Sequence, residues 1–302
     1  MKRVHHPSIV RLHDDIINKD TCVLVMELAE GRPLQGEFTQ AKLIDISDAL
    51  LGALSEMHHK NIVHLDIKPT NIMYDERPDG SWTVKLIDFG LARASDGERA
   101  LGHTSDVSTM QTQSAGVAGT FMFMPPEQLE GKALDFAADV FAMGITLYQL
   151  SCGRYPHSEV CESNAAALLE VRSWAQNPPP LLHDQRSDIN KSFSHFVMSA
   201  IAVDRAQRYR SAPEMFGALQ KLKRTVFISW RMAECKEEVK QLQPALEAHG
   251  VKVIVVGELP GGDLKRAVEA GMAEAHLFII MGTATYGKKT SGKIDTWAEM
   301  QE

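Results

Sequence analysis

The 302-residue sequence predicts an α+β protein, in which a short β-rich start leads into a mainly helical region and then into a region of alternating strands and helices. Three observations support this prediction. Residues 4–30 have the pattern of two strands joined by a polar turn. Residues 39–60 carry apolar side chains at helical spacing, with Thr39 as the expected N-cap. From residue 225 onward, strands and helices alternate with short connections, which is typical of a parallel sheet covered by helices.

The composition excludes several classes of protein. The formal net charge of −7 gives no electrostatic reason to expect nucleic acid or an anionic membrane as a partner. The apolar runs are much too short to cross a bilayer, and no apolar segment follows the basic residues at the start, as it would in a secretory signal. The four cysteines form no C-x-x-C pair, which favours reduced thiols. We therefore expect a cytoplasmic protein.

One short segment carries the side chains that phosphoryl transfer requires. Residues 62–74, IVHLDIKPTNIMY, place Asp66, Lys68 and Asn71 on one polar loop between apolar pairs. A carboxylate accepts the proton of an attacking hydroxyl, a lysine neutralises charge on the phosphate, and an amide oxygen ligates a metal ion. Asp88 follows a later apolar run and adds a carboxylate suited to magnesium. The sequence therefore predicts that Asn71 and Asp88 face one metal site.

These motifs resemble those of the eukaryotic-type protein kinases. The family's catalytic loop, H-R-D-x-K-x-x-N, is present as residues 64–71, and its D-F-G motif is present as residues 88–90. Chance occurrence in an unrelated fold is a poor explanation for both motifs in this order. One residue departs from the pattern, because Leu65 stands where the family has arginine. That arginine usually pairs with a phosphorylated residue, so we expect that this ion pair does not switch the chain.

The resemblance implies a serine/threonine protein kinase that uses ATP and Mg²⁺ to phosphorylate a protein substrate. Asp66 would accept the hydroxyl proton, and Lys68 would contact the phosphate. Asn71 and Asp88 would bind magnesium. Thr120 would orient Asp66 and Lys68, and Thr120 together with Lys68 follows the serine/threonine pattern rather than the tyrosine pattern.

By the same resemblance, residues 1–30 are a remnant of the kinase small lobe and the hinge. The family places adenine binding at five residues, namely the gatekeeper Met26, the hinge residues Glu27, Leu28 and Ala29, and the apolar Met73. An ordinary buried hairpin is the structural alternative and is compatible with adenine binding, and Met73 is equally well explained as part of the core. No glycine-rich loop and no phosphate-pairing lysine precede Val4. We therefore expect a fragment of a longer gene product, the alternative being a natural protein without most of its small lobe.

Residues 91–119 are small and polar without apolar periodicity, which indicates a loop corresponding to the family's activation segment. We expect phosphorylation of at least one of its hydroxyl residues Ser108, Thr109, Thr112 and Ser114, the alternative being a passive solvated loop. Beyond it, Glu127 should form a buried ion pair with Arg208, and Asp139 should anchor the backbone of the catalytic loop. We expect His58 and His59 to face solvent or the end of their helix rather than to bind metal.

Residues 225–302 resemble the first two thirds of a TIR domain, which has a flavodoxin-like α/β fold. The segment 226–230, VFISW, matches the first strand, and 261–264, GGDL, matches the start of a helix after the second strand. Some TIR domains cleave NAD with a glutamate in a later helix, for which Glu299 is the one reasonable match. We expect instead an interaction module with TIR–TIR self-association.

The predicted domains are therefore a small-lobe remnant at 1–30, a kinase large lobe at 31–222 and a partial TIR-like domain at 225–302. Two alternatives to a protein serine/threonine kinase stay open, namely a pseudokinase or scaffold with a TIR-type interaction module, and a TIR enzyme that cleaves NAD. Retention of Asp66, Lys68, Asn71 and Asp88 favours kinase chemistry in the parent protein. The missing small-lobe lysine argues against such chemistry in this chain alone.

Overall fold

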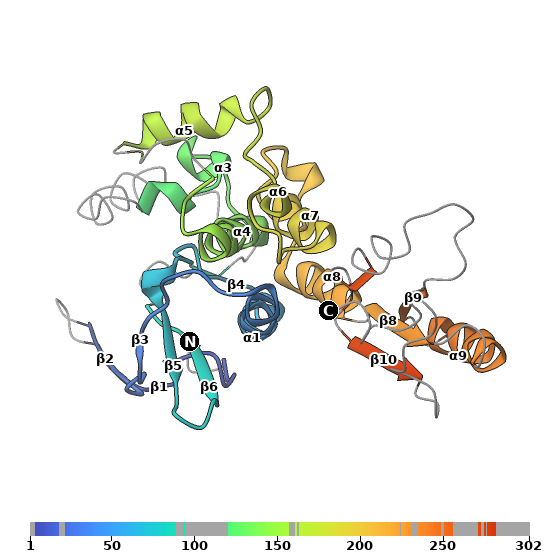
Figure 1. The fold of residues 1–302 in the computed structure, drawn as a ribbon. Coiled ribbons are helices and arrows are strands. Elements are labelled where there is room, and N and C mark those ends of the chain that lie inside the picture. The colour runs from blue at the N-terminus through green and yellow to red at the C-terminus, as the bar shows by residue number, and fades with distance from the viewer. Residues whose placement is uncertain are drawn as a thin grey trace.

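The computed structural model describes residues 4–17, 22–88, 93–94, 120–156, 161, 163–223, 225–230, 235–248, 251–255, 271–272, 275 and 277–281. The chain begins with short antiparallel sheets and continues into a lobe of packed helices. A parallel sheet with one adjoining helix follows (Figure 1). This order of elements agrees with the arrangement predicted from the sequence.

The β-rich start contains a hairpin and a three-stranded sheet. Strands β1 (Leu12–Ile17) and β2 (Cys22–Met26) pair antiparallel, and β3 (Arg32–Pro33), β5 (Ile72–Glu76) and β6 (Trp82–Leu86) form an antiparallel sheet in the order β3-β5-β6. The apolar side chains of β2 are exposed, with Val23 at 51% and Met26 at 44%. A buried hairpin, one of the explanations drawn from the sequence, is therefore wrong, because no layer of described residues covers this face.

A tight turn sets the register of β5 and β6. The Gly80 N–H donates to the Arg77 carbonyl at 3.0 Å, and Gly80 has a φ of 81°, a conformation that glycine adopts without steric cost. The pairing then runs from Glu76 opposite Trp82 to Ile72 opposite Leu86. The two strands consequently end side by side, immediately next to the catalytic loop and to Ile87.

The helical lobe is built from α1 (Gln40–His59), α4 (Phe136–Cys152), α7 (Lys191–Ala200) and α8 (Ala212–Lys223). Shorter or more peripheral helices complete it: α3 (Pro126–Leu129), α5 (Asn164–Ser173), α6 (Leu182–Gln185) and the 3₁₀ turns η1 (Pro69–Asn71), η2 (Thr120–Phe123) and η3 (Arg205–Gln207). The Thr39 hydroxyl accepts from the Lys42 N–H at 3.4 Å and begins α1, as predicted.

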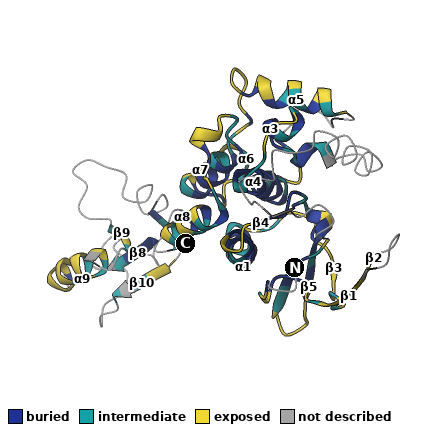
Figure 2. Cartoon of the chain, turned by 180° about the vertical axis from the view of Figure 1, so that it is seen from behind, coloured by how far each residue is buried: buried dark blue, intermediate teal, exposed yellow. Residues whose placement is uncertain are grey.

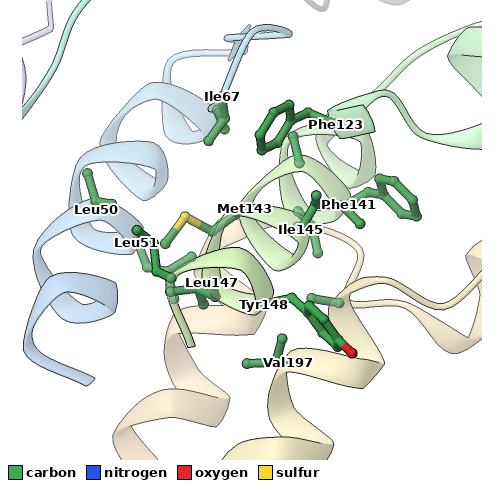
Figure 3. Close-up of a cluster of buried hydrophobic side chains, with 14 of the residues drawn as sticks. Leu50, Leu51, Ile67, Phe123, Phe141, Met143, Ile145, Leu147, Tyr148 and Val197 are labelled. Carbon is green, nitrogen blue, oxygen red and sulfur yellow. The ribbon is translucent and has the colours of Figure 1, made fainter. Parts of the chain in front are cut away.

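Helix α4 is the centre of the lobe because it is apolar almost all round, which requires burial on every side. It lies dark blue along its length in Figure 2, whereas α5 shows exposed residues. Figure 3 shows Met143 and Leu147 of α4 packed beside Leu50 and Leu51 of α1. Gly144 permits the close approach of α7, since a Cβ there would lie 2.8 Å from that of Ala200.

The second region contains β8 (Thr225–Trp230), α9 (Lys236–Ala248), β9 (Lys252–Val255) and β10 (Leu277–Met281). Its strands are parallel in the order β10-β8-β9, which confirms the predicted parallel sheet. The consecutive residues Val226, Phe227 and Ile228 of β8 are all buried. The predicted second helix lies mostly outside the described residues. Within the described part of the chain, every helix is too short or too polar to cross a membrane.

A buried ion pair ties α3 to the segment that precedes α8. Arg208 donates to both carboxylate oxygens of Glu127, at 2.8 and 3.4 Å, and its side chain is fully buried. The remaining donors of this guanidinium bond backbone carbonyls, including those of Ala137 and Ala202. Its carbon lies 4.9 Å from the ring centre of Phe141 in α4. The predicted pair of Glu127 and Arg208 is confirmed.

Truncation of this pair should destabilise the lobe strongly. Glu127→Ala leaves the Arg208 charge buried without its counterion, so we expect the free energy of unfolding to fall by about 3–5 kcal/mol in urea denaturation followed by far-UV circular dichroism. The matched control is Glu56→Ala, which removes a partly exposed i,i+4 pair with Lys60 and should cost only about 0.3–0.5 kcal/mol. Equal losses in the two variants would contradict the structural role of the pair.

Candidate functional site

The structure brings three of the predicted site residues together on the loop between β4 (Ile62–Val63) and β5. The Lys68 ammonium lies 2.9 Å from Asp66 Oδ1. The Asn71 side-chain N–H₂ donates to Asp66 Oδ2 at 2.8 Å and to the Asp66 carbonyl at 2.9 Å. Asp66 therefore has one oxygen held by a cation and the other by an amide, so the orientation of its carboxylate is fixed.

The backbone of this loop is anchored by Asp139, in the first turn of α4. Asp139 Oδ2 accepts from the His64 N–H and Oδ1 accepts from the Leu65 N–H, both at 2.8 Å. The Asp139 side chain is completely buried. Leu65 has a φ of 66°, a left-handed conformation that costs energy for a residue other than glycine. The predicted anchoring role of Asp139 is confirmed.

His58 is a further part of this anchor. It lies in the last turn of α1, one of the two predicted positions, whereas the other, a solvent-facing side chain, is wrong. The His58 side chain is buried, and its Nδ1 accepts from the Ala212 N–H at 3.0 Å. The ring proton is consequently on Nε2, which donates to Asp139 Oδ2 at 3.0 Å. The ring also stacks on Phe136 at 4.4 Å between centroids. The signal in the sequence was its spacing of four residues from Leu54, on the apolar face of α1.

Leu65, which stands where the family has a charged arginine, packs into a small apolar cluster. The cluster joins Leu65 of the loop and Val63 of β4 to Phe136 and Ala138 in the first turn of α4 and to Leu134 just before it. This contact is consistent with the expectation that no arginine–phosphate pair operates at this position. The catalytic loop and α4 are thus joined by an apolar contact as well as by the Asp139 carboxylate.

His64 is a buried titratable group at the centre of the site. Burial lowers the pKa of His64, and the nearby carboxylates of Asp139, Asp66 and Asp88 oppose this effect without outweighing it. The Asp66 N–H lies 3.3 Å from His64 Nδ1, so this ring nitrogen acts as an acceptor. His64 therefore stays neutral at a pH where an exposed histidine is partly protonated.

Asn71 and Asp88, the predicted metal ligands, are positioned by neighbouring backbone. The Ile87 N–H donates to the Asn71 carbonyl at 2.8 Å, which holds Asp88 next to the catalytic loop. Because the Asn71 N–H₂ group faces Asp66, its Oδ1 remains as an acceptor. Asp88 has a φ of 59°. One amide oxygen and one carboxylate fit Mg²⁺, which usually takes its other ligands from water and substrate phosphates.

That metal site would differ from a protein-only site. Within the described residues, no three histidine, cysteine or acidic side chains come together around a position for a metal ion. The rest of the D-F-G motif, Phe89 and Gly90, lies outside the described residues. The predicted pair of Asn71 and Asp88 supplies two oxygen ligands, and Mg²⁺ commonly completes its coordination with water and substrate phosphates.

The predicted adenine-binding hinge is tied to the β5–β6 sheet by Lys85. The Lys85 ammonium lies 2.8 Å from Glu27 Oε1, and the hydrogen bond from Lys85 lowers the pKa of Glu27. The Glu27 N–H donates to the Arg11 carbonyl at 2.8 Å, and the Arg11 N–H donates to Glu27 Oε2 at 3.1 Å. Lys85 is directly opposite Met73 in the sheet, so the two side chains lie on the same face. Met73, the predicted apolar residue of the adenine site, is therefore on the face from which Lys85 contacts Glu27. The sequence did not identify Lys85 as a site residue. Its place in the alternating pattern of β6 nevertheless puts its side chain on the same face of the sheet as that of Met73.

The other predicted hinge residues are near the surface, and several predicted residues are not described. Leu28 is 87% exposed and Ala29 adjoins it, while Met26 ends β2.

Thr120 begins η2, but its side chain lies outside the described part. The predicted phosphorylation sites, the GGDL segment and the proposed NAD-cleaving glutamate also lie outside the described residues, namely Ser108, Thr109, Thr112, Ser114, residues 261–264 and Glu299.

A groove of about 520 Å³ opens beside the catalytic loop. It is bounded by the loop itself, by the segment before α1, by η2 and by the C-terminal end of α4. The lining residues are Pro33, Leu34, Gln35, Gly36, Glu37, Lys68, Pro69, Thr70, Phe123, Gln149, Leu150, Gly153 and Tyr155. Because Lys68 both lines the groove and pairs with Asp66, the groove leads directly to the predicted transfer site.

Comparison with known proteins gives matches along the whole chain. Residues 1–220 match the family described as protein kinase domain, and residues 226–302 match the family described as TIR domain. These matches confirm the predicted fold class and the predicted family resemblance.

Curated relatives carry names of the same kind. The probable serine/threonine-protein kinase CE0033 of Corynebacterium efficiens is 33% identical over 232 residues, covering 74% of this chain and 33% of that protein. Serine/threonine-protein kinase pkn3 of Myxococcus xanthus is 30% identical over 227 residues, covering 72% and 39%. Serine/threonine-protein kinase PrkC of Bacillus subtilis is 26% identical over 298 residues, covering 97% and 40%. The chain thus spans less than half the length of these relatives.

Loss of the buried charge on α4 should release the catalytic loop. Asp139→Asn keeps the side-chain size but replaces one acceptor by an N–H₂ group that faces backbone donors. We expect the His64 and Leu65 amides to exchange hydrogen at least about tenfold faster, because hydrogen bonds to a charged group contribute roughly 1.5–3 kcal/mol. Asp135→Asn, at the N-cap of the same helix, is the control, since asparagine caps equally well. Unchanged exchange in Asp139→Asn would refute the anchoring role.

Burial of His64 should make stability depend on pH. As the pH falls below about 6.5, the unfolded chain gains a proton at this histidine while the folded protein does not, so acid destabilises the fold. We expect His64→Asn to reduce the slope of unfolding free energy between pH 5.5 and 7 by up to about 1.4 kcal/mol per pH unit. Ser47→Ala, at a buried residue that does not titrate, should leave this slope unchanged. Identical slopes in the wild type and His64→Asn would contradict the lowered pKa.

Proposed function

We propose, since this chain belongs to the protein kinase family, that it transfers the γ-phosphate of ATP to serine or threonine hydroxyls of a protein substrate. The observation that carries the proposal is the fixed Asp66 carboxylate, held by Lys68 and Asn71 on a loop that Asp139 anchors. We also propose the division into a small-lobe remnant at 1–30, a large lobe at 31–222 and a partial TIR domain at 225–302.

The proposed role of Asp66 follows from its surroundings. A carboxylate of fixed orientation accepts a hydrogen bond from a substrate hydroxyl and then its proton as the oxygen attacks. Lys68 lies next to the same carboxylate, where its positive charge would stabilise the negative charge of the transferring group. Thr120, at the start of η2, is the proposed partner that orients these two residues. Preorganisation by Asp139 means that little reorganisation is required at the moment of transfer.

The nucleotide site is proposed from the remaining residues. Mg-ATP, the phosphate donor that protein kinases generally use, supplies the transferable group when it is bound. Asn71 and Asp88 are the proposed magnesium ligands, and the preference of Mg²⁺ for carboxylate and amide oxygens supports this assignment. The proposed adenine site comprises Met26, the backbone of Glu27, Leu28 and Ala29, and the apolar side chain of Met73. The Glu27–Lys85 ion pair supports it by fixing the hinge against the sheet.

One observation favours a second candidate function, a pseudokinase or scaffold. The exposed apolar side chains of the β1–β2 hairpin, including Ile16 and Val23, suit a contact with another protein surface. In that case the anchored loop would be a structural element, and the chain would not transfer phosphate. The phosphate-transfer experiment described below separates the two candidates.

For the TIR domain we propose an interaction module. TIR domains commonly self-associate, and the parallel sheet of residues 225–281 supports a domain of this type. NAD cleavage with Glu299 stays an untested alternative, because this residue lies outside the described part. Cytoplasmic localisation and the absence of nucleic acid and membrane partners likewise stay predictions.

The kinase proposal is tested by Asp66→Asn in the full chain. Asparagine keeps the size of the side chain but is a very weak proton acceptor, so we expect transfer of radiolabelled γ-phosphate from Mg-ATP to a serine/threonine substrate to fall by about 10²–10⁴-fold. Nucleotide affinity, measured by calorimetry, should change little. Asp79→Asn, at an exposed turn, serves as control and should transfer at the wild-type rate. Absence of transfer by the wild-type chain would contradict the proposal and favour the scaffold.

A further inference from the structure

Residues 4–10 form a strap that joins the start of β1 to the end of β6 (Figure 1). The Leu86 N–H donates to the Ser8 carbonyl at 2.9 Å, and the Val10 N–H donates to the Leu86 carbonyl at 3.0 Å. These two bonds hold β6 at its last residue, two positions before Asp88. The geometry of the strap therefore helps to fix the strand that leads to the proposed magnesium ligand.

The ring of His6 closes a turn within this strap. The Ser8 N–H donates to His6 Nδ1 at 3.1 Å, and the Ile9 N–H donates to the His6 carbonyl at 3.0 Å. Because Nδ1 accepts a hydrogen bond, the neutral ring carries its proton on Nε2. A protonated imidazole has a hydrogen on both nitrogens and is a donor only. The bond from Ser8 therefore exists only while His6 is neutral.

Helix α1 provides the space for this ring at Gly52. A glycine in a helix interior costs roughly 0.5–1 kcal/mol relative to alanine, and Gly52 lies well inside α1. A Cβ at this position would lie 3.1 Å from His6 Nε2 and 3.5 Å from His6 Cε1. The ring thus lies where the methyl group of an alanine would crowd it, and the contact with α1 partly removes the ring from water.

Two opposing effects determine the protonation of His6. Burial lowers the pKa of His6, and the carboxylate of Glu56, four residues after Gly52 on α1, raises it without outweighing burial. Glu56 also pairs with Lys60, whose ammonium lies 2.7 Å from Glu56 Oε1. Of the charges in the described part of the chain, that of Glu56 is the one that acts on His6. His6 consequently stays neutral at a pH where an exposed histidine is partly protonated.

We propose that His6 is a pH-sensitive latch, in which protonation of the ring opens the turn of residues 6–9 and releases the end of β6. The contact between the strap and β6 is then firm at neutral pH and loose in acid. The ion pair of Glu27 with Lys85 still joins the hairpin to the sheet at a second point, so release loosens the strap without detaching it. The latch acts on the fold and requires no phosphate transfer.

The direction of the pH effect follows from proton linkage. In the released strap His6 is an exposed histidine with a pKa of about 6.5. In the closed strap its pKa is lower, so below about pH 6.5 the released form binds the additional proton. The equilibrium constant for release therefore increases by up to about tenfold per pH unit, until the closed form becomes protonated as well.

The test is hydrogen exchange of the Leu86 and Val10 amides in the full chain between pH 7 and 5.5. Each rate is divided by the intrinsic rate of an unstructured peptide at the same pH, which gives an opening constant. We expect the opening constants of both amides to increase at least about threefold over this range.

Two substitutions at His6 separate its charge from its role as an acceptor. His6→Asn retains an acceptor for the N–H two residues on and does not titrate in this range, so its opening constants should match those of the wild type at pH 7 and stay constant in acid. His6→Lys carries a charge at every pH of the experiment and has no acceptor. It should already show at pH 7 the opening constants that the wild type reaches at pH 5.5.

Glu56→Gln tests the charge that opposes burial. It removes the carboxylate that raises the pKa of His6, so the increase in the opening constants should begin at a lower pH than in the wild type. A shift to higher pH would contradict the proposed balance between burial and this carboxylate.

The matched control is His5→Asn, at the exposed neighbouring histidine, which should retain the full pH response. His64 is a buried histidine whose electrostatics include the Ile87 backbone next to β6, and it is unchanged in every variant. A pH response that persists in His6→Asn would therefore belong to another group and overturn the proposal. Opening constants that do not change with pH in the wild type, or that are equal in His6→Lys and the wild type at pH 7, would also overturn it.

Discussion

The site depends on one buried carboxylate, that of Asp139. A charge without solvent is strongly unfavourable unless several donors surround it. Here two donors come from the backbone of the catalytic loop and one from His58 of α1. His58 in turn accepts from the first residue of α8, Ala212. The requirement to satisfy a single charge thus holds four segments in one arrangement, although they are far apart in the sequence.

The ion pair of Glu127 and Arg208 acts in the same way on the other side of α4. It connects α3, next to η2, with the chain just before α8, and it rests on the ring of Phe141. Helix α4 therefore lies between two desolvated charge clusters that face different parts of the site. One cluster fixes the loop that carries Asp66, and the other fixes the segment that follows the activation region. Both are costly to break, which favours a unique arrangement over a loosely packed one.

The sequence predicted those features that depend on local pattern or on a recognisable motif. The helical spacing of apolar residues and the Thr39 N-cap predicted α1, and the alternation of strands and helices after residue 225 predicted the parallel sheet. The ion pair of Glu127 with Arg208 and the anchor at Asp139 followed from the family resemblance. The roles of His58 and Lys85 were not predicted, because each depends on a partner that a distant segment supplies. Periodicity indicates which face a residue occupies, but it does not identify the group on the opposite side.

The apolar contact of Leu65 has a consequence for how the catalytic loop responds to its surroundings. An arginine–phosphate link at this position would weaken with salt, since mobile ions screen exposed charges. A hydrophobic contact with Leu134 and Phe136 is almost insensitive to ionic strength, but it weakens on cooling because apolar burial has a large heat-capacity change. The apolar part of the coupling between this loop and α4 therefore responds to temperature more than to the salt or phosphate content of its surroundings.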